Sequence, residues 1–145
     1  TVARLCGLPS IVGIKEGSGS VQQASEIANM CGDRMTVLAG DDALTLPMMA
    51  VGSKGVISVT SNVAPLQMAQ LVKAFLGGQI EEAQRIHFAL SPLFTALFYE
   101  TNPIPVKTAL GMMGKIDPEL RLPLCDMATE TKEQLTRALR DAGLI

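Results

Sequence analysis

Three short apolar runs constrain the fold class of this chain most strongly. They are residues 11–16 (IVGIKE), 36–41 (TVLAGD) and 55–60 (GVISVT), and each is rich in valine, isoleucine or threonine. Their apolar residues are consecutive and do not alternate with polar ones, which is typical of strands buried on both faces of a parallel sheet. Because helical spacing follows each run, the sequence predicts three successive βα units. A (β/α)8 barrel and an open doubly wound sheet both satisfy this pattern.

The pattern changes after Gly77 and Gly78. From there on the apolar spacing is helical, with predicted helices at residues 79–99, 103–115 and 128–144. The last of these is expected to begin at a Thr129 cap. We therefore expect a βα portion over residues 1–77 and an all-helical domain over residues 78–145. Three parallel strands alone leave sheet edges exposed, so the chain is expected to belong to a larger domain or to pair with another segment.

Charge and composition exclude several classes of function. The chain of 145 residues has 12 basic and 14 acidic side chains mixed along its length, which gives no electrostatic case for binding nucleic acid or an anionic membrane. No apolar run approaches the ~20 residues of a membrane span, and the first residues lack the apolar core of a signal peptide. Three separated cysteines and a single histidine argue against a zinc site and a disulfide framework. These features fit a cytoplasmic protein without a metal centre.

Lys15 stands at the end of the first apolar run. Side chains alternate along a strand, so Gly13 and Lys15 share one face, and Gly13 leaves space beside the lysine stem. If that face points into a barrel, Lys15 lies among apolar neighbours near the C-terminal mouth, where barrel active sites form. Desolvation lowers the pKa of a lysine, and the neutral amine is a nucleophile that forms a Schiff base with a carbonyl carbon.

Other interpretations of this segment stand beside the catalytic one. A lysine that ends a strand commonly reaches solvent or pairs with a carboxylate such as that of Glu16. The glycine-rich turn at residues 17–20 (GSGS) suggests phosphate binding, but the glycine spacing fits neither a dinucleotide fingerprint nor a P-loop. We therefore expect a plain helix start there, with Ser18 or Ser20 as its cap.

Three further candidates have simple structural interpretations. Asp41 and Asp42 follow the second apolar run, where paired carboxylates bind metals or act as an acid–base pair, but capping of the next helix is the stronger interpretation. By composition alone, Ile57 is a core residue that shares a face with Gly55. His87 has no acidic partner at catalytic spacing and is expected to be a surface or packed histidine.

Several linked motifs resemble the dihydrodipicolinate synthase family of pyruvate-dependent class I aldolases. In order along the chain they are IVGIKE (11–16), LAGDD (38–42), GVISVTSNVAP (55–65), NPIPVKTALGMMG (102–114) and LRLPL (120–124). The similarity runs over essentially the whole chain, and the fixed order of five motifs makes it far more specific than any one of them.

The resemblance implies a (β/α)8 barrel followed by a C-terminal helical domain, assembled as a dimer of dimers. It implies a cytoplasmic lyase of lysine and diaminopimelate biosynthesis that condenses pyruvate with aspartate semialdehyde and needs no organic cofactor. The family's Schiff-base lysine falls on Lys15 and the glycine of its GDD motif on Gly40. The isoleucine whose backbone helps to hold pyruvate falls on Ile57, and Asn102 matches a residue near the second substrate.

The chain also departs from the family pattern. A (β/α)8 barrel takes about 250 residues, and this chain matches only the last three βα units and the helical domain. The family's catalytic tyrosine, the threonine beside it and the arginine that binds the semialdehyde have no counterpart here, and Tyr99 does not match the catalytic tyrosine. Two alternatives stay open. One is a related aldolase, such as an N-acetylneuraminate lyase or a keto-deoxy-sugar-acid aldolase, and the other is a catalytically silent assembly module.

Overall fold

The computed structural model describes all residues from 1 to 145. The chain divides into two compact units, and each is described by itself. The first unit comprises residues Thr1–Ser58 and Val72–Gln84, and the second comprises Val59–Leu71 and Arg85–Ile145. The boundary expected near Gly77 concerns the domains of a larger protein and stays a prediction.

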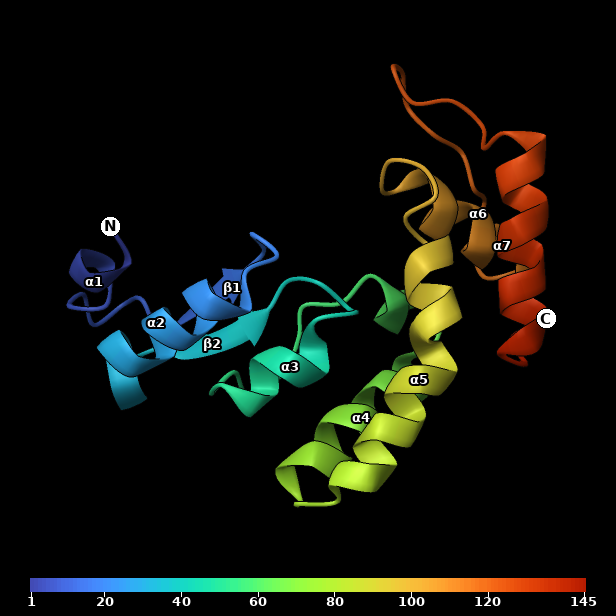
Figure 1. Cartoon of the computed structure of the whole chain (residues 1–145). Coiled ribbons are helices and arrows are strands. Elements are labelled where there is room, and N and C mark those ends of the chain that lie inside the picture. The colour runs from blue at the N-terminus through green and yellow to red at the C-terminus, as the bar shows by residue number, and fades with distance from the viewer. The chain divides into compact units, whose positions relative to one another are not determined.

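The first unit contains a parallel pair of strands with helices on one side (Figure 1). Its main elements are α1 (Val2–Leu5), β1 (Gly13–Glu16), α2 (Val21–Cys31), β2 (Thr36–Ala39) and α3 (Thr45–Ala50). The strands are parallel and in direct register, from Gly13 opposite Thr36 to Glu16 opposite Ala39. The first two apolar runs therefore form the parallel strands that the sequence predicts, and the helix between them is the expected crossover.

The third apolar run does not form the full strand that was expected. Only Val56 pairs with the sheet, through an isolated parallel bridge to Ala39. Parallel pairing with β2 starts on this run. The Ala39 amide donates to the Gly55 carbonyl and the Ile57 amide donates to the Ala39 carbonyl, both at 2.8 Å. The pairing then ends in the 3₁₀ turn at Thr60–Asn62. β1 also has a partner on one side only and still forms a full strand, so the difference lies in this 3₁₀ turn, which begins within the run and ends its extended backbone.

The helix starts agree with the sequence in one case and differ in another. The Ser20 hydroxyl caps α2 by accepting the Gln23 amide at 3.1 Å, which confirms one of the two expected caps. In contrast, α3 begins after Leu44 without a side-chain cap, so the expectation that Asp41 or Asp42 caps it is wrong. The Asp41 carboxylate instead accepts the Ala43 amide at 2.9 Å, which closes a turn before the helix.

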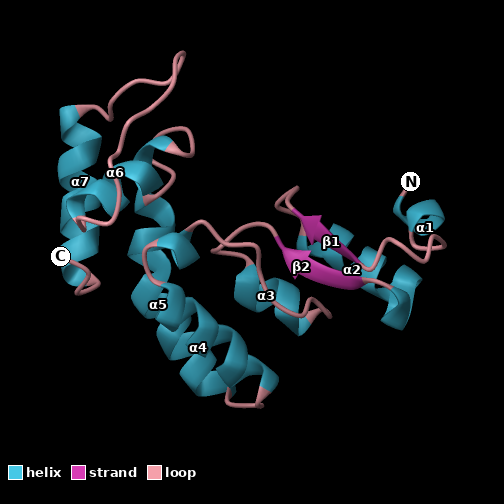
Figure 2. Cartoon of the chain, turned by 180° about the vertical axis from the view of Figure 1, so that it is seen from behind, coloured by secondary structure: helices cyan, strands magenta, loops and turns pink.

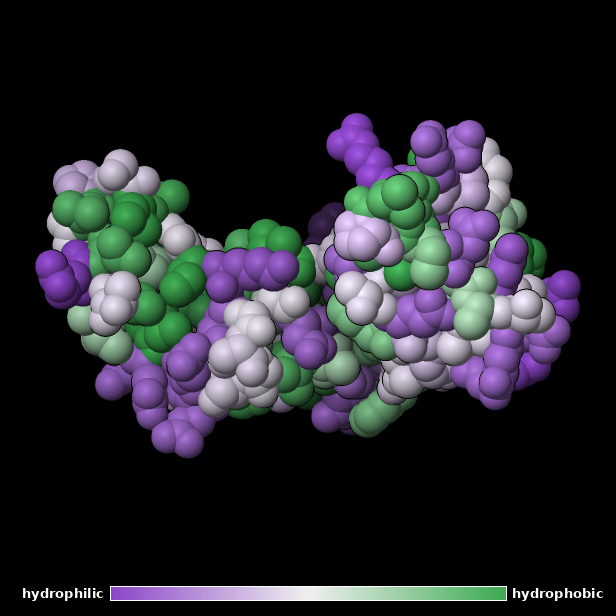
Figure 3. Space-filling model, turned by 90° about the horizontal axis from the view of Figure 1, so that it is seen from above, coloured by the Kyte–Doolittle hydropathy of each residue, from purple (hydrophilic) through white to green (hydrophobic).

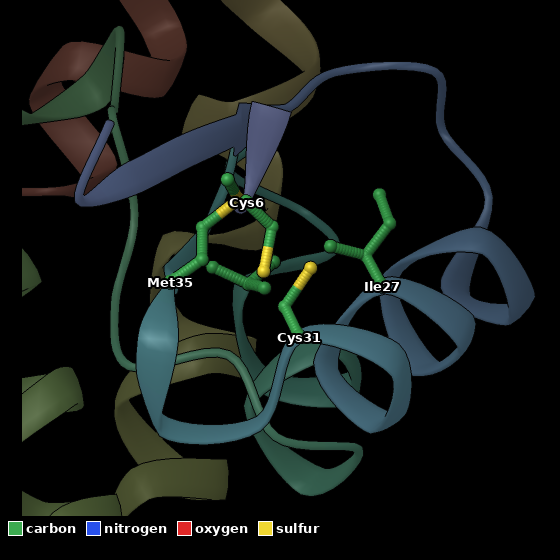
Figure 4. Packing of buried hydrophobic residues seen from close by; sticks show 5 residues of the cluster. Cys6, Ile27, Cys31 and Met35 are labelled. Atoms are coloured by element: carbon green, nitrogen blue, oxygen red, sulfur yellow. The ribbon is translucent and has the colours of Figure 1, made fainter. Parts of the chain in front are cut away.

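The core of the first unit lies between α2 and one face of the strands. One cluster joins Cys6 to α2 and the start of β2, and its side chains gather between helix and sheet in Figure 4; its buried members are Cys6, Ile27, Cys31, Met35 and Val37. Burial, together with a contact from the Cys6 thiol, raises the pKa of the Cys31 thiol. Both cysteines are free and buried in this core.

The other face of the two strands is open. Seen from behind in Figure 2, the strands face the viewer and no helix of the first unit lies over them. Lys15 and Thr36, which alternation along the strands places on this face, are exposed, and Figure 3 shows hydrophobic residues reaching the surface beside hydrophilic ones. No helix of the structure is both long and apolar enough to cross a membrane.

The rest of the chain contains four α-helices, and the last three of them lie within the helix ranges predicted after Gly78. The helices are α4 (Pro65–Leu76), α5 (Ile80–Ala96), α6 (Ile104–Met112) and α7 (Thr129–Asp141). The N-cap of α7 is Ala128, so the expected Thr129 cap is wrong. The Glu100 carboxylate, in the segment between α5 and α6, holds the start of α7, because its Oε1 accepts the Ala128 amide at 3.0 Å and the Thr131 hydroxyl.

His87 on α5 is packed, as expected. Its ring lies edge-on to Phe88, with centroids 5.5 Å apart, and tilted against Phe94 at 5.6 Å. Burial lowers the pKa of His87, so its neutral form is favoured.

Candidate active site

Lys15 lies on β1 and its side chain is exposed to solvent. The expectation that apolar neighbours bury it is therefore wrong for this chain. The reason is the open face of the sheet, because burial there requires elements that the first unit does not contain. A pocket of about 250 Å³ in the same unit has a different lining, made by residues around the start of β2 that do not include Lys15.

The strand register brings Lys15, Gly40 and Ile57 to one face of the sheet. Lys15 pairs with Leu38, and paired residues of neighbouring strands share a face. Ala39 pairs with Val56, so the residues that follow them, Gly40 and Ile57, lie on the opposite face, which is that of Lys15. Ile57 is 47% exposed there and is not the core residue that its composition indicates. The face therefore groups three of the four candidate residues at the C-terminal ends of parallel strands.

Gly40 lies in close contact with the end of β1. Its amide donates to the Glu16 carbonyl at 2.6 Å. A Cβ atom at this position would lie 2.6 Å from the Glu16 carbonyl oxygen, 2.8 Å from the Gly17 Cα and 3.0 Å from the Lys15 Cε. Two of these atoms belong to the backbone, which cannot move away without displacing the end of β1. Glycine is therefore required here for the approach of β1 and for the space beside the lysine stem.

Sequence reasoning missed the role of Glu16, which is 2% exposed on the covered face. Its Oε1 accepts the Ser18 amide and the Gln23 side-chain amide, both at 2.9 Å. Its Oε2 is buried without a hydrogen-bond partner in this chain. The available signal was a carboxylate at the third position of an otherwise apolar strand face, after Val12 and Ile14.

The pKa of Glu16 predicts an acid-sensitive contribution to stability. Burial acts to raise this pKa, but the hydrogen bonds from Ser18 and Gln23 outweigh it and hold the pKa below its ordinary value of 4.5. The stability contributed by the ionised carboxylate is therefore complete above that ordinary value and is lost as the pH falls through the lower, folded-state pKa.

We expect Glu16→Gln to flatten the decrease in unfolding free energy between about pH 5 and pH 3. Urea unfolding at a series of pH values measures this slope. Glu26→Gln, which changes an exposed carboxylate on α2, is the matched control and should keep the wild-type slope. Parallel curves for wild type and Glu16→Gln would contradict the prediction.

Asn102, the fourth candidate, belongs to the second unit. It is exposed in the segment between α5 and α6, and its peptide bond to Pro103 is cis. Its assignment near the second substrate stays a prediction.

A family model matches almost the whole chain. The model described as "Dihydrodipicolinate synthetase family" matches residues 1–142. The chain belongs to this family. Among curated members of the dihydrodipicolinate synthetase family, the 4-hydroxy-tetrahydrodipicolinate synthase of Thermodesulfovibrio yellowstonii is 57% identical over all 145 residues. The synthase of the same name from Geobacter metallireducens is 52% identical over the same length. The chain spans about half the length of these relatives, 50% of each.

Solved structures of the family have the same backbone fold. Dihydrodipicolinate synthase from Thermotoga maritima superposes with a TM-score of 0.95 at 41% identity, covering 99% of this chain and 50% of that one. The synthase from Acinetobacter baumannii, which was crystallised with pyruvate, superposes with a TM-score of 0.95 at 39% identity, covering 99% of this chain and 50% of that one. These neighbours are TIM-barrel enzymes, so the mixed helix and sheet of this chain corresponds to half of such an enzyme.

Proposed function

We propose that this chain carries the Schiff-base-forming part of a 4-hydroxy-tetrahydrodipicolinate synthase. The observation that supports the proposal most strongly is the grouping of Lys15, Gly40 and Ile57 on one face at the C-terminal ends of parallel strands. In barrel enzymes the reacting groups lie at these ends. The high identity to relatives named as this synthase favours it over the sugar-acid aldolases.

In the proposed reaction, the neutral amine of Lys15 attacks the carbonyl carbon of pyruvate. Loss of water leaves an iminium ion, which withdraws electrons from the neighbouring methyl carbon. That carbon loses a proton and becomes an enamine. The enamine carbon then forms a bond to the aldehyde carbon of aspartate semialdehyde, whose oxygen takes up a proton. Gly40 leaves room for the lysine stem, Ile57 borders the pyruvate site, and Asn102 lies on the side of the second substrate.

The proposal includes the finer features of the family. Residues 1–77 form the last three βα units of a (β/α)8 barrel, and residues 78–145 form a helical domain. The complete protein is a cytoplasmic dimer of dimers and needs no organic cofactor. The missing cover over Lys15 comes from the other half of the barrel.

The exposure of Lys15 supports a second candidate, in which the chain alone is catalytically silent. A lysine reacts efficiently with a carbonyl only where its surroundings hold the two groups together, and nothing in this chain covers Lys15. In this case Lys15 gains its reactivity only when the other half of the barrel covers it.

Borohydride trapping tests both candidates. The protein is mixed with pyruvate near neutral pH and reduced, and the carboxyethyl adduct on each lysine is quantified by peptide mapping. We expect Lys15 to be labelled at least about tenfold more than the exposed Lys54, which serves as an internal reference, and Lys15→Arg to remove this excess.

The outcome separates the candidates. Excess labelling of Lys15 in the chain alone supports a pre-formed site. Excess labelling only after the first half of the Thermodesulfovibrio yellowstonii relative is added supports the silent chain. No excess under either condition contradicts the proposed function. Cleavage of a sugar acid without aspartate semialdehyde would favour a related aldolase.

A further inference from the structure

We propose that Glu16 is a positioning residue for Lys15: its carboxylate and its carbonyl fix the end of β1 and thereby the direction of the lysine stem. This inference rests on the proposed function and adds a residue to it.

The side chain of Glu16 joins three consecutive parts of the βα unit. Glu16 follows Lys15 directly but points to the covered face, where one oxygen accepts the Ser18 amide and the Gln23 side chain. Ser18 lies in the turn after β1, and Gln23 lies in the first turn of α2. Hydrogen bonds to a charged acceptor are stronger than those to a neutral one. This carboxylate therefore connects the residue after Lys15 both to the turn that follows and to the start of α2.

The Gln23 side chain is itself fixed in place. Its backbone amide donates to the Ser20 hydroxyl at 3.1 Å, and its side-chain amide also reaches the Ser18 hydroxyl at 3.3 Å. Serine followed three residues later by glutamine is the pattern of a capping box, in which the glutamine returns to the backbone of the cap residue. Here the glutamine is directed to Glu16 instead. The start of α2 is therefore connected to the residue after Lys15.

The main chain of Glu16 provides a second connection. Its carbonyl accepts the Gly40 amide at 2.6 Å, and a Cβ on Gly40 would lie 3.0 Å from the Lys15 Cε. The atoms that hold Glu16 and the atoms that border the lysine stem are therefore adjacent. A shift of the Glu16 peptide moves the stem relative to Gly40.

The second carboxylate oxygen of Glu16 indicates that this side chain does not serve to pack the core. Oε2 is buried and has no hydrogen-bond partner in this chain, which disfavours folding. An apolar side chain like that of Ile14, two residues earlier on the same face, would fill the space without this cost. Costly buried polar groups of this kind are typical of functional sites.

The test compares Glu16 with a matched exposed pair on α2. Glu16→Ala and Gln23→Ala break the connection. Glu26→Ala and Gln22→Ala make the same changes in a neighbouring pair, in which the Gln22 side chain donates to Glu26 at 2.9 Å in solvent. The readout is the ratio of carboxyethyl adduct on Lys15 to that on Lys54, under whichever condition gives excess labelling in the wild type. Amide hydrogen exchange at Gly40 is measured in parallel.

We expect Glu16→Ala to lower the labelling ratio about tenfold or more and to accelerate exchange at Gly40, because small displacements of a reacting group have large effects on rate. Glu16→Gln keeps one acceptor oxygen and should recover part of the labelling, and both control variants should match the wild type. An unchanged ratio in Glu16→Ala overturns the inference. Equal losses in Glu16→Ala and Glu16→Gln with wild-type exchange at Gly40 also overturn it, because charge would then act without positioning.

Failure of the proposed function gives a different result. If wild-type Lys15 shows no excess labelling under either condition, the Schiff-base proposal is wrong. The exchange rate at Gly40 in Glu16→Ala then still reports on the connection between Glu16 and the end of β1.

Discussion

Gly40→Ala is expected to abolish the excess labelling of Lys15 by pyruvate. The new methyl group would lie 2.6 Å from the Glu16 carbonyl oxygen and 2.8 Å from the Gly17 Cα, so the end of β1 must move away from β2. The same methyl group would lie 3.0 Å from the Lys15 Cε and push the stem aside. We expect the ratio of adduct on Lys15 to adduct on Lys54 to fall to about one, because a small misplacement of a reacting group has a large effect on rate. Overpacking of this kind also destabilises a protein by about 1–3 kcal/mol.

Gly17→Ala is the matched control for this change. It replaces a glycine in the adjoining turn, and a Cβ there has no other atom within 4 Å. We expect wild-type labelling and nearly wild-type stability for this variant. Equal labelling of Lys15 in Gly40→Ala and in the wild type would show that the close approach of β1 and β2 does not determine the position of the lysine.

Leu135→Ala is expected to destabilise the second unit by about 2–5 kcal/mol, the usual cost of a cavity in a packed core. Leu135 is fully buried on α7, with 0% of its surface exposed. Its helix is amphipathic and has few apolar residues, so each buried leucine carries a large share of the packing. Hydrogen exchange of the α7 amides, read together with urea unfolding, measures the loss.

Leu122→Ala makes the same chemical change at a leucine that is 92% exposed. We expect an effect within about 0.5 kcal/mol, as for most surface substitutions. Similar losses at Leu122 and Leu135 would contradict the packing of α7 described above.

Local patterns predicted most of the elements because helices and strand segments depend mainly on nearby residues. The apolar runs at 11–16 and 36–41 contain β1 and β2, and the helical spacing from Gln79 onward contains α5, α6 and α7. The prediction of a full strand over the third run was wrong because the 3₁₀ turn at Thr60–Asn62 begins within the run, which the apolar pattern does not indicate. The cap of α7 was missed because its partner is distant in sequence, since Glu100 is 28 residues away from Ala128.

The candidate site was predictable to a similar degree. Alternation along strands placed Lys15 on the face of Gly13, and the register of the sheet extends this face to Gly40. The burial of Lys15 was not predictable, because burial depends on which other elements cover a face. The contact between Glu16 and Gln23 was also not predictable, because the pattern around Ser20 favours an ordinary capping box.

The outer edge of β1 has a consequence for the behaviour of this chain in concentrated solution. β1 pairs with β2 along one side only, so its other side presents backbone donors and acceptors without a neighbouring strand. Such an edge is a template for self-association, and natural proteins often protect it with a lysine. Lys15 is an exposed residue of this edge strand, so we expect solubility and chemistry to depend on the same side chain. Substitutions that neutralise it are therefore best handled in dilute samples, where loss of reactivity is not confused with precipitation.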